Sequence, residues 1–183
     1  MSSPQDELLT DYSVLPQLAA EKKEENDFFK NFLKKFPSAA LDRIFQPIAN
    51  SVTEKIDCTQ CGNCCRYLEP GITEEEAGTL ASLKSMSREI FIRDFTQREV
   101  GTETLFMNHQ PCIFFDGKLC MIYDQRPASC QDFPHLAKEN FKFRFTSIMA
   151  NYAICPIVFN SVEKLKEQLK FSDFDMAREN FKH

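Results

Sequence analysis

Four cysteines stand within eight residues, in the run Cys58-Thr-Gln-Cys61-Gly-Asn-Cys64-Cys65. Two-residue gaps let successive thiolates turn toward one ion, because the intervening backbone forms a tight loop whose amide N–H groups can point at sulfur. Gly62 suits a position with a positive φ angle in such a loop. Cysteines this close in sequence seldom reach the Cα separation and torsion of an unstrained disulfide. The run therefore predicts a metal-binding loop, with disulfides only as an oxidation product of the metal-free chain.

The other four cysteines are dispersed along the chain, at Cys112, Cys120, Cys130 and Cys155. The first two flank Asp116-Gly117, and Asp-Gly between apolar runs is a signal for a tight hairpin. Such a turn would bring both sulfurs near one site. Cys155 precedes Pro156, and a Cys-Pro pair closes many three-plus-one iron–sulfur sets. The dispersed thiols are therefore candidates to complete a metal site.

The sulfur atoms can be divided between sites in more than one way. One division gives a first set of Cys58, Cys61, Cys64 and Cys155 and a second set of Cys65, Cys112, Cys120 and Cys130. Zinc and an iron–sulfur cluster both agree with this spacing, as do one site and two. Gathered thiolates without a cation would become protonated, because burial raises their pKa, so we expect the metal to be part of the fold.

Charge and hydropathy restrict the partners and the compartment. The net charge is -5 over 183 residues, whereas binding to a polyanion needs clustered Lys and Arg, so nucleic acid is excluded as the main partner. The N-terminus lacks a basic stretch followed by an apolar run, and no segment approaches the roughly 18 apolar residues of a membrane span. We therefore expect a cytoplasmic protein with reduced thiols and no membrane contact, whose candidate partner is another protein.

The cysteines divide the chain into three predicted regions: an N-terminal helical extension (residues 1–57), a cysteine-cluster metal-binding domain (58–160) and a C-terminal helix and tail (161–183). Phenylalanines at helical spacing predict a helix over residues 28–36 that Pro37 ends, and Ser38 is the predicted N-cap of the next helix. These two helices pack either on the metal domain or on a partner, and packing on the domain is the favoured interpretation.

Local signals within the cysteine region indicate short helices and strands. Thr73, followed by three glutamates, predicts a capping box, and Ser87 predicts the start of another helix. Residues 102–123 are strand-like, and Ser161 is the predicted N-cap of a C-terminal helix. The predicted fold class is mainly helical α+β, a small metal-stabilised domain with a short β-hairpin and irregular cysteine-bearing loops.

Histidines and one arginine are further candidates near the thiols. His109 stands three residues before Cys112, but a surface role is favoured over a ligand role for it, as it is for His135, which follows Pro134. His183 is the last residue and is not expected to bind metal. Arg126 either binds an anion or, in the favoured interpretation, offsets the negative charge of the thiolates.

The joint spacing of the cysteines resembles a known family. The run Cys58-x2-Cys61-Gly-x-Cys64-Cys65 is followed by Pro-Cys112-Ile-Phe-Phe-x4-Cys120-x-Ile-Tyr-x2-Arg-Pro-x2-Cys130-x2-Phe-Pro and then by Cys155-Pro156. This order is similar to the YkgJ-type cysteine-cluster family, a zinc- or iron-chelating domain, over about 100 residues of the chain. The N-terminal helices lie outside the resemblance.

The resemblance implies a ligand set but no settled activity. It implies metal binding by Cys58, Cys61, Cys64, Cys65, Cys112, Cys120, Cys130 and Cys155. Members are often labelled iron–sulfur oxidoreductases, and a related cysteine set occurs in the longer flagellin lysine methylases. One departure is visible, because Gln131 stands where the family has an arginine. An anion site built on that arginine is therefore not expected here.

Two functions agree with these features, and whether the chain is an enzyme stays open between them. The favoured one is a metal-binding module that docks another protein or carries metal, because the chain has no His-Glu-x-x-His, P-loop or Gly-x-Gly-x-x-Gly motif. The alternative is an iron–sulfur oxidoreductase or electron carrier. A catalytic zinc hydrolase is disfavoured, because all-thiolate sites are usually closed, and the Cys-x3-Cys-x2-Cys signature of S-adenosylmethionine radical enzymes is missing.

Overall fold

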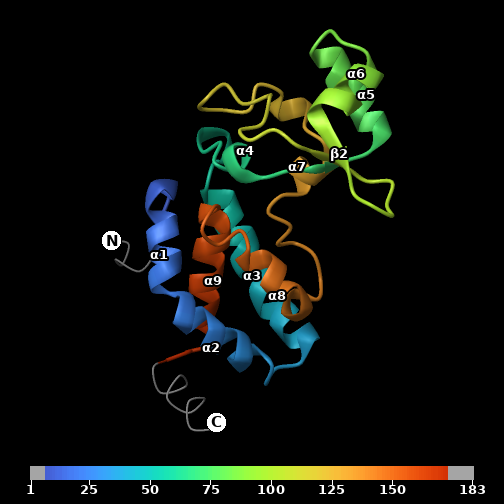
Figure 1. Ribbon diagram of the computed structural model, residues 1–183. Coiled ribbons are helices and arrows are strands. Elements are labelled where there is room, and N and C mark those ends of the chain that lie inside the picture. Colours follow the sequence, from blue (N-terminus) through green and yellow to red (C-terminus); the bar gives the residue numbers. More distant parts are fainter. Residues whose placement is uncertain (1–6, 173–183) are drawn as a thin grey trace. The chain divides into compact units, whose positions relative to one another are not determined.

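The computed structural model describes residues 7–172, and the chain forms two compact units. Unit 1 consists of Met1–Asp57 and Pro134–His183, and unit 2 consists of Cys58–Phe133. Residues 134–160, which the sequence analysis groups with the cysteine domain, lie in unit 1 with the N-terminal helices. Unit 2 is thus inserted in sequence between the two halves of unit 1 (Figure 1).

Unit 1 is built from helices. They are a 3-10 turn (Tyr12–Val14), α1 (Leu15–Glu21), α2 (Lys23–Leu33), α3 (Ser38–Lys55), α8 (Phe141–Met149) and α9 (Pro156–Gln168). Helix α3 contacts both α8 and α9, and Figure 1 shows α3 and α9 running side by side. None of the helices in residues 7–172 is long and apolar enough to cross a bilayer.

The core of unit 1 is rich in stacked phenylalanines. The rings of Phe45 on α3 and Phe141 on α8 are stacked with their centroids 3.9 Å apart. Phe145, one turn after Phe141, meets Phe29 of α2 edge-on at 5.8 Å. Aromatic pairs in such geometries contribute about 0.5–1.5 kcal/mol beyond the area that they bury. The phenylalanine stripe that predicts a helix thus also forms the contact between the N-terminal and C-terminal halves of the unit.

Polar contacts fix the start of α8 and the end of α2. The Asp42 carboxylate accepts hydrogen bonds from the backbone N–H groups of Asn140 and Phe141, at 2.9 and 2.8 Å. The Lys142 ammonium donates to the carbonyl oxygens of Lys34 and Phe36, at 2.9 and 2.7 Å. Both satisfy backbone groups that a helix end leaves without intrahelical partners.

Two predicted helix starts are wrong. Helix α3 has Pro37 as its N-cap, and the hydroxyl of Ser38 is buried without a hydrogen-bond partner. Helix α9 begins at Pro156 with Cys155 as its N-cap, so Ser161 lies within the helix and is fully buried. In α9, proline suits the first helical position because its missing N–H would have no partner there, and this outweighs the capping preference of Ser161.

Unit 2 combines short helices with a small antiparallel sheet. The elements are a 3-10 turn (Cys58–Gln60), α4 (Cys64–Tyr67), β1 (Gly71–Ile72), α5 (Glu74–Leu83), α6 (Arg88–Phe95), β2 (Thr96–Arg98), β3 (Leu105–Met107), a 3-10 turn (Tyr123–Gln125) and α7 (Ala128–Asp132). The strand order is β1-β3-β2, with Ile72 opposite Leu105 and Thr96 opposite Met107. The predicted mainly helical α+β class is confirmed.

Local signals in unit 2 had mixed outcomes. The capping box is confirmed, because the Thr73 hydroxyl accepts from the Glu76 N–H and the Glu76 carboxylate accepts from the Thr73 N–H. The Ser87 N-cap is also confirmed. The prediction of strands through residues 102–123 is wrong after β3. The Phe115 N–H donates to the Cys112 carbonyl in a turn, and the predicted hairpin is reduced to one isolated bridge between Phe115 and Cys120.

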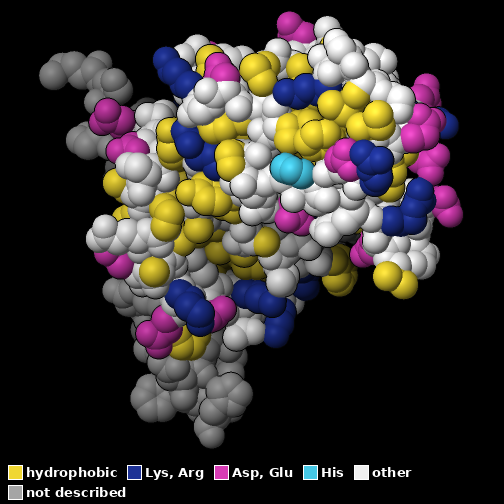
Figure 2. Space-filling view, turned by 45° about the horizontal axis from the view of Figure 1, so that its top comes forward, with side chains coloured by type: hydrophobic (Ala, Val, Ile, Leu, Met, Phe, Trp, Pro, Cys, Tyr) yellow, Lys and Arg dark blue, Asp and Glu magenta, His cyan; other side chains and the backbone are white. Residues whose placement is uncertain are grey.

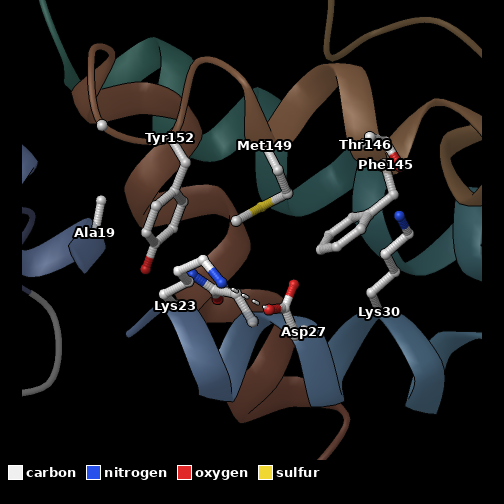
Figure 3. A pocket seen from close by; sticks show the side chains of 10 residues that line it. Ala19, Lys23, Asp27, Lys30, Phe145, Thr146, Met149 and Tyr152 are labelled. Carbon is white, nitrogen blue, oxygen red and sulfur yellow. Dashed lines mark hydrogen bonds and ion pairs between the residues drawn. The ribbon is translucent and has the colours of Figure 1, made fainter. Parts of the chain in front are cut away.

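A groove of about 240 Å³ lies between α2 and the segment that carries α8 (Figure 3). Its apolar wall includes Phe145, Met149 and Tyr152, and an ion pair of 3.4 Å between Lys23 and Asp27 spans its opposite side. None of its lining residues is a cysteine. The groove is therefore separate from the thiols of unit 2.

A buried ion network joins α2 and α9. The side chain of Lys166 is 5% exposed, and its ammonium lies 2.8 Å from Glu25 and 2.7 Å from Glu163. Lys22 contacts the same two carboxylates, and the Tyr152 hydroxyl donates to Glu163 at 2.7 Å. Because the two lysines face two carboxylates, the charges of this network balance.

Replacing Lys166→Ala should lower the free energy of unfolding by about 3 kcal/mol, because two partly buried carboxylates lose a buried cation. Urea unfolding followed by circular dichroism measures the change. The matched control is Lys23→Ala, whose ion pair is exposed and which should change stability by less than about 0.5 kcal/mol. Equal effects of the two substitutions would contradict a structural role for the network.

Candidate metal centre

The cysteine-rich loop turns on a glycine that admits no side chain. The Cys61 N–H donates to the Cys58 carbonyl at 3.3 Å, and the Cys65 N–H donates to the Gly62 carbonyl at 3.1 Å. Gly62 has a φ of +61°, and a Cβ placed there would lie 2.2 Å from the Lys118 carbonyl oxygen. The loop and the turn that contains Lys118 therefore approach each other at a distance that only glycine allows.

The turn at Asp116 and Gly117 is closed by its own hydrogen bonds. The Asp116 N–H donates to the Leu119 carbonyl at 3.1 Å, and the Asp116 carboxylate accepts from the N–H groups of Lys118 and Leu119 at 2.7 and 2.6 Å. Beside the turn, Phe115 and Cys120 form an isolated antiparallel bridge. The predicted turn is thus present, and it orients the backbone around Cys120.

Backbone and arginine contacts attach this turn to the cysteine-rich loop. The Cys112 N–H donates to the Cys65 carbonyl at 2.8 Å. The Arg66 guanidinium donates to the Gly117 carbonyl at 2.7 Å and lies 4.6 Å from the centre of the Phe115 ring. Arg66 is a residue that the sequence analysis missed, and its place directly after the adjacent cysteines was the available signal.

Seven of the eight cysteines lie in unit 2, and several of their sulfurs are close together. The Cys65 thiol is within hydrogen-bonding reach of the sulfurs of Cys64 and Cys120. Cys112 and Cys130 are near enough for negative charge on Cys64 and Cys120 to raise their pKa values. The structure thus brings thiols from three separate parts of the sequence into one cluster.

The outer cysteines are placed differently. Cys61 lies beside Cys64, whose charge adds to the effect of burial in raising the Cys61 pKa. Cys58 begins the loop as part of a 3-10 turn and is half-buried. Cys155 lies in unit 1, where it is 7% exposed and caps α9. None of the eight cysteines, all within the described residues, is in a disulfide.

Shared protons and one cation set the ionisation of the central sulfurs. A hydrogen bond from Cys65 lowers the pKa of Cys120 to about 6 and that of Cys64 to about 7, and the charge of Arg126 acts in the same direction. The same hydrogen bonds raise the pKa of Cys65, which keeps the proton. Burial, reinforced by nearby thiolates, raises the pKa of Cys130 to about 12. Hydrogen bonds and the arginine charge therefore act against burial and mutual repulsion within one cluster.

Arg126 has a fixed position at the edge of the cluster. Its guanidinium lies 3.5 Å from the centre of the Tyr123 ring, and its Nε donates to the Tyr123 carbonyl at 2.7 Å. The Gln131 amide donates to the Arg126 carbonyl at 2.6 Å, so the residue that departs from the family pattern supports the arginine backbone. These contacts favour the interpretation of Arg126 as a group that offsets thiolate charge.

The histidines have other surroundings. The His109 ring lies 5.0 Å from the Phe95 ring, and its Nδ1 is 2.7 Å from the Asn108 side-chain oxygen. His135 is in unit 1, at a φ of 61°, and its carbonyl accepts from Arg144 at 2.8 Å. His183 lies outside the described residues. The candidate centre is therefore built on sulfur.

The donor chemistry fits zinc or iron, since thiolates are preferred ligands of both zinc and iron–sulfur clusters. Within residues 7–172, no three His, Cys, Asp or Glu side chains are already arranged around a point that could hold an ion. The thiols that act on one another's pKa values through charge or hydrogen bonding include Cys64, Cys65, Cys112, Cys120 and Cys130.

Substituting Gly62→Ala should weaken metal binding at least about tenfold, because the added Cβ pushes the loop away from the Lys118 carbonyl at a cost above about 1.4 kcal/mol. Competition with a chromophoric chelator measures the affinity. Gly101→Ala is the matched control, because Gly101 also has a positive φ but no atom lies within 4 Å of its added Cβ. An unchanged affinity for the first variant would show that the close approach is dispensable.

Substituting Arg126→Gln should raise the pKa values of Cys120 and Cys64, because the Arg126 charge adds to the effect of the Cys65 hydrogen bond in lowering them. In the metal-free protein, Cys120 would then react more slowly with iodoacetamide near its pKa of about 6, and the two rates would converge above about pH 9. Mass spectrometry of the alkylated peptides across pH measures this. Arg126→Lys keeps the charge and should retain most of the reactivity, so equal loss in both variants would contradict the electrostatic cause.

Comparison with known proteins identifies a family for this chain. The family model CxxCxxCC, described as "Putative zinc- or iron-chelating domain", matches residues 57–155. Searches of curated proteins and of solved structures gave no match. The matched segment covers all eight cysteines and more than half of the 183 residues. The chain therefore belongs to the CxxCxxCC family of zinc- or iron-chelating domains.

Proposed function

We propose that this protein is a metal-chelating module that binds zinc or iron through cysteine thiolates. The observation that carries the proposal is the convergence of Cys65 with Cys120, two thiols from distant parts of the sequence that lie within hydrogen-bonding reach. A hydrophobic core would not favour gathering ionisable thiols, since each resists burial in its charged form. A bound cation reverses that cost.

The residues of unit 2 take distinct roles under this proposal. The five clustered thiols, Cys64, Cys65, Cys112, Cys120 and Cys130, supply the inner ligands. The family pattern also implies Cys58 and Cys61, on the same loop, and Cys155, which lies in unit 1. A bound metal would supply a cross-link between segments far apart in sequence, worth roughly 10–16 kcal/mol for structural zinc at neutral pH.

The core of unit 2 connects the thiols to the rest of the fold. Cys112 packs against the buried cluster that includes Phe91, Leu105 and Phe114. The Lys84 ammonium lies 5.1 Å from the centre of the Phe114 ring and adds positive charge near Cys112. Loss of metal should therefore loosen the packing of the sheet and of α5. A metal that stabilises this packing would provide a rigid surface on which another protein could dock.

The environment of the protein is also a proposal. Eight cysteines without a disulfide suit a reducing cytoplasm, where disulfides are uncommon. On the face shown in Figure 2, Lys and Arg are interspersed with Asp and Glu, and the net charge is -5. A polyanion needs a concentrated basic surface, so a protein partner fits better than nucleic acid.

Anaerobic purification followed by elemental and acid-labile sulfide analysis tests the proposal. Stoichiometric zinc without sulfide and without visible absorption would identify a structural zinc site. Iron with sulfide and a broad visible spectrum would instead identify an iron–sulfur centre, and with it the oxidoreductase or electron-carrier alternative. A protein that holds no metal, even after reconstitution with zinc or ferrous iron, would overturn the proposed function.

Removing a central ligand gives a second test. Cys120→Ser should lower metal affinity by more than about a hundredfold, because even residues that only support ligands cost 10–100-fold when they are removed. Met121→Ser is the matched control, since its exposed side chain neighbours Cys120 but has no ligand chemistry of comparable strength. Metal affinity is measured by chelator competition, and a normal affinity for Cys120→Ser would remove this residue from the ligand set.

A further inference from the structure

The central thiols form a contiguous set in which one pair stands out. Cys65 lies within hydrogen-bonding reach of both Cys64 and Cys120. Cys64 is its neighbour in sequence, and a disulfide between adjacent cysteines requires a strained ring. Cys120 comes from the segment across the cluster, so only the second pair can join without that strain.

The backbone holds Cys65 and Cys120 in place without help from their side chains. The Cys112 N–H donates to the Cys65 carbonyl at 2.8 Å, and the Phe115–Cys120 bridge is reinforced by the Met121 N–H, which donates to the Phe114 carbonyl at 2.9 Å. The close approach of Gly62 to the Lys118 carbonyl fixes the same two segments. Because the two segments are already held together, a disulfide between these sulfurs has a small cost in chain entropy.

Neither residue of this pair is fully buried. Cys65 and Cys120 are half-buried, in contrast to Cys155, which is 7% exposed. Peroxides react with accessible cysteines, so position and access coincide at one pair.

We propose that the metal-free protein is a redox switch in which a peroxide joins Cys65 and Cys120 in a disulfide, withdrawing two ligands from the metal centre. This inference rests on the proposed metal-binding function for its consequence, while the bond itself forms without metal. Bound metal occupies both sulfurs and protects them. Oxidation after metal release prevents reloading until a thiol reductant opens the bond.

The chemistry balances with one peroxide per disulfide. The Cys120 thiolate attacks a peroxide oxygen, the O–O bond breaks and hydroxide leaves, which produces a sulfenic acid. The Cys65 sulfur then attacks the sulfenic sulfur, so the S–S bond forms, the S–O bond breaks and the departing hydroxide takes the Cys65 proton as water. Two thiols lose two electrons and two protons, and hydrogen peroxide is reduced to two waters. Glutathione returns the pair to thiols by exchange.

Peptide mapping of the full-length protein tests the assignment. Metal-free protein is treated with hydrogen peroxide, its remaining thiols are blocked with N-ethylmaleimide, and it is digested without reduction by trypsin and endoproteinase Asp-N. These enzymes place Cys120 alone in peptide 119–123, Cys130 in peptide 124–131, and the CxxCxxCC run in peptide 57–66. The expected product links peptides 57–66 and 119–123, with fragmentation that places the bond on Cys65.

Variants and metal separate this proposal from the proposed function. Cys65→Ser and Cys120→Ser should each abolish the linked product, Cys58→Ser should retain it, and zinc added before peroxide should suppress it. Normal zinc binding with a predominant link at other cysteines, or with no link, overturns the switch alone. Failure to bind both zinc and ferrous iron overturns the proposed function, while the map of the wild-type metal-free protein still decides the pair, even if a variant fails to fold.

Discussion

The proximity of the thiols depends on the hydrogen bond from the Cys112 N–H to the Cys65 carbonyl. It attaches the segment before the Asp116 turn to the cysteine-rich loop, and the Arg66 guanidinium attaches the turn itself through the Gly117 carbonyl. Neither contact involves a sulfur atom, so both remain when the cysteines gain or lose protons. The cluster is thereby partly organised before a cation arrives, which lowers the ordering cost of binding.

A positive charge in the cluster would stabilise the ionised form of its thiols. Burial and mutual repulsion raise the pKa values of Cys112 and Cys130, whereas the proton on Cys65 and the charge of Arg126 lower those of Cys64 and Cys120. A divalent ion would replace the shared proton and deprotonate the remaining ligands. The arginine contributes permanent charge and would still be useful there, because four thiolates exceed the charge of one divalent ion.

The features that could be predicted from sequence are those that neighbouring residues determine. The capping box at Thr73 involves atoms three residues apart, and the Asp116 turn is closed by its own side chain. The family pattern also identified the cysteines that cluster in unit 2. By contrast, β1 and β2 are short and pair only through β3, so their sequences carry little periodicity.

Other outcomes required the tertiary structure. Ser161 has the sequence features of a helix start, yet Pro156 begins that helix more than one turn earlier and Ser161 becomes part of its buried face. The return of the chain to unit 1 at Pro134 depends on the stacking of Phe141 with Phe45, a contact between residues far apart in sequence. Arg66 was overlooked because its partner, the Gly117 carbonyl, is a backbone atom that no sequence pattern marks.

The insertion of unit 2 within unit 1 has a consequence for biosynthesis. A ribosome releases α1, α2 and α3 long before α8 and α9, so the first half of the bundle emerges with its phenylalanine face uncovered. Residues 58–133 connect the two halves of unit 1 as a loop, and the entropy cost of bringing its ends together grows with the effective length of the loop. That effective length is shorter when the segment is compact than when it is extended. Early collapse of residues 58–133 would therefore hasten completion of the helical bundle, and the supply of metal during translation would set how long that apolar face stays exposed to chaperones.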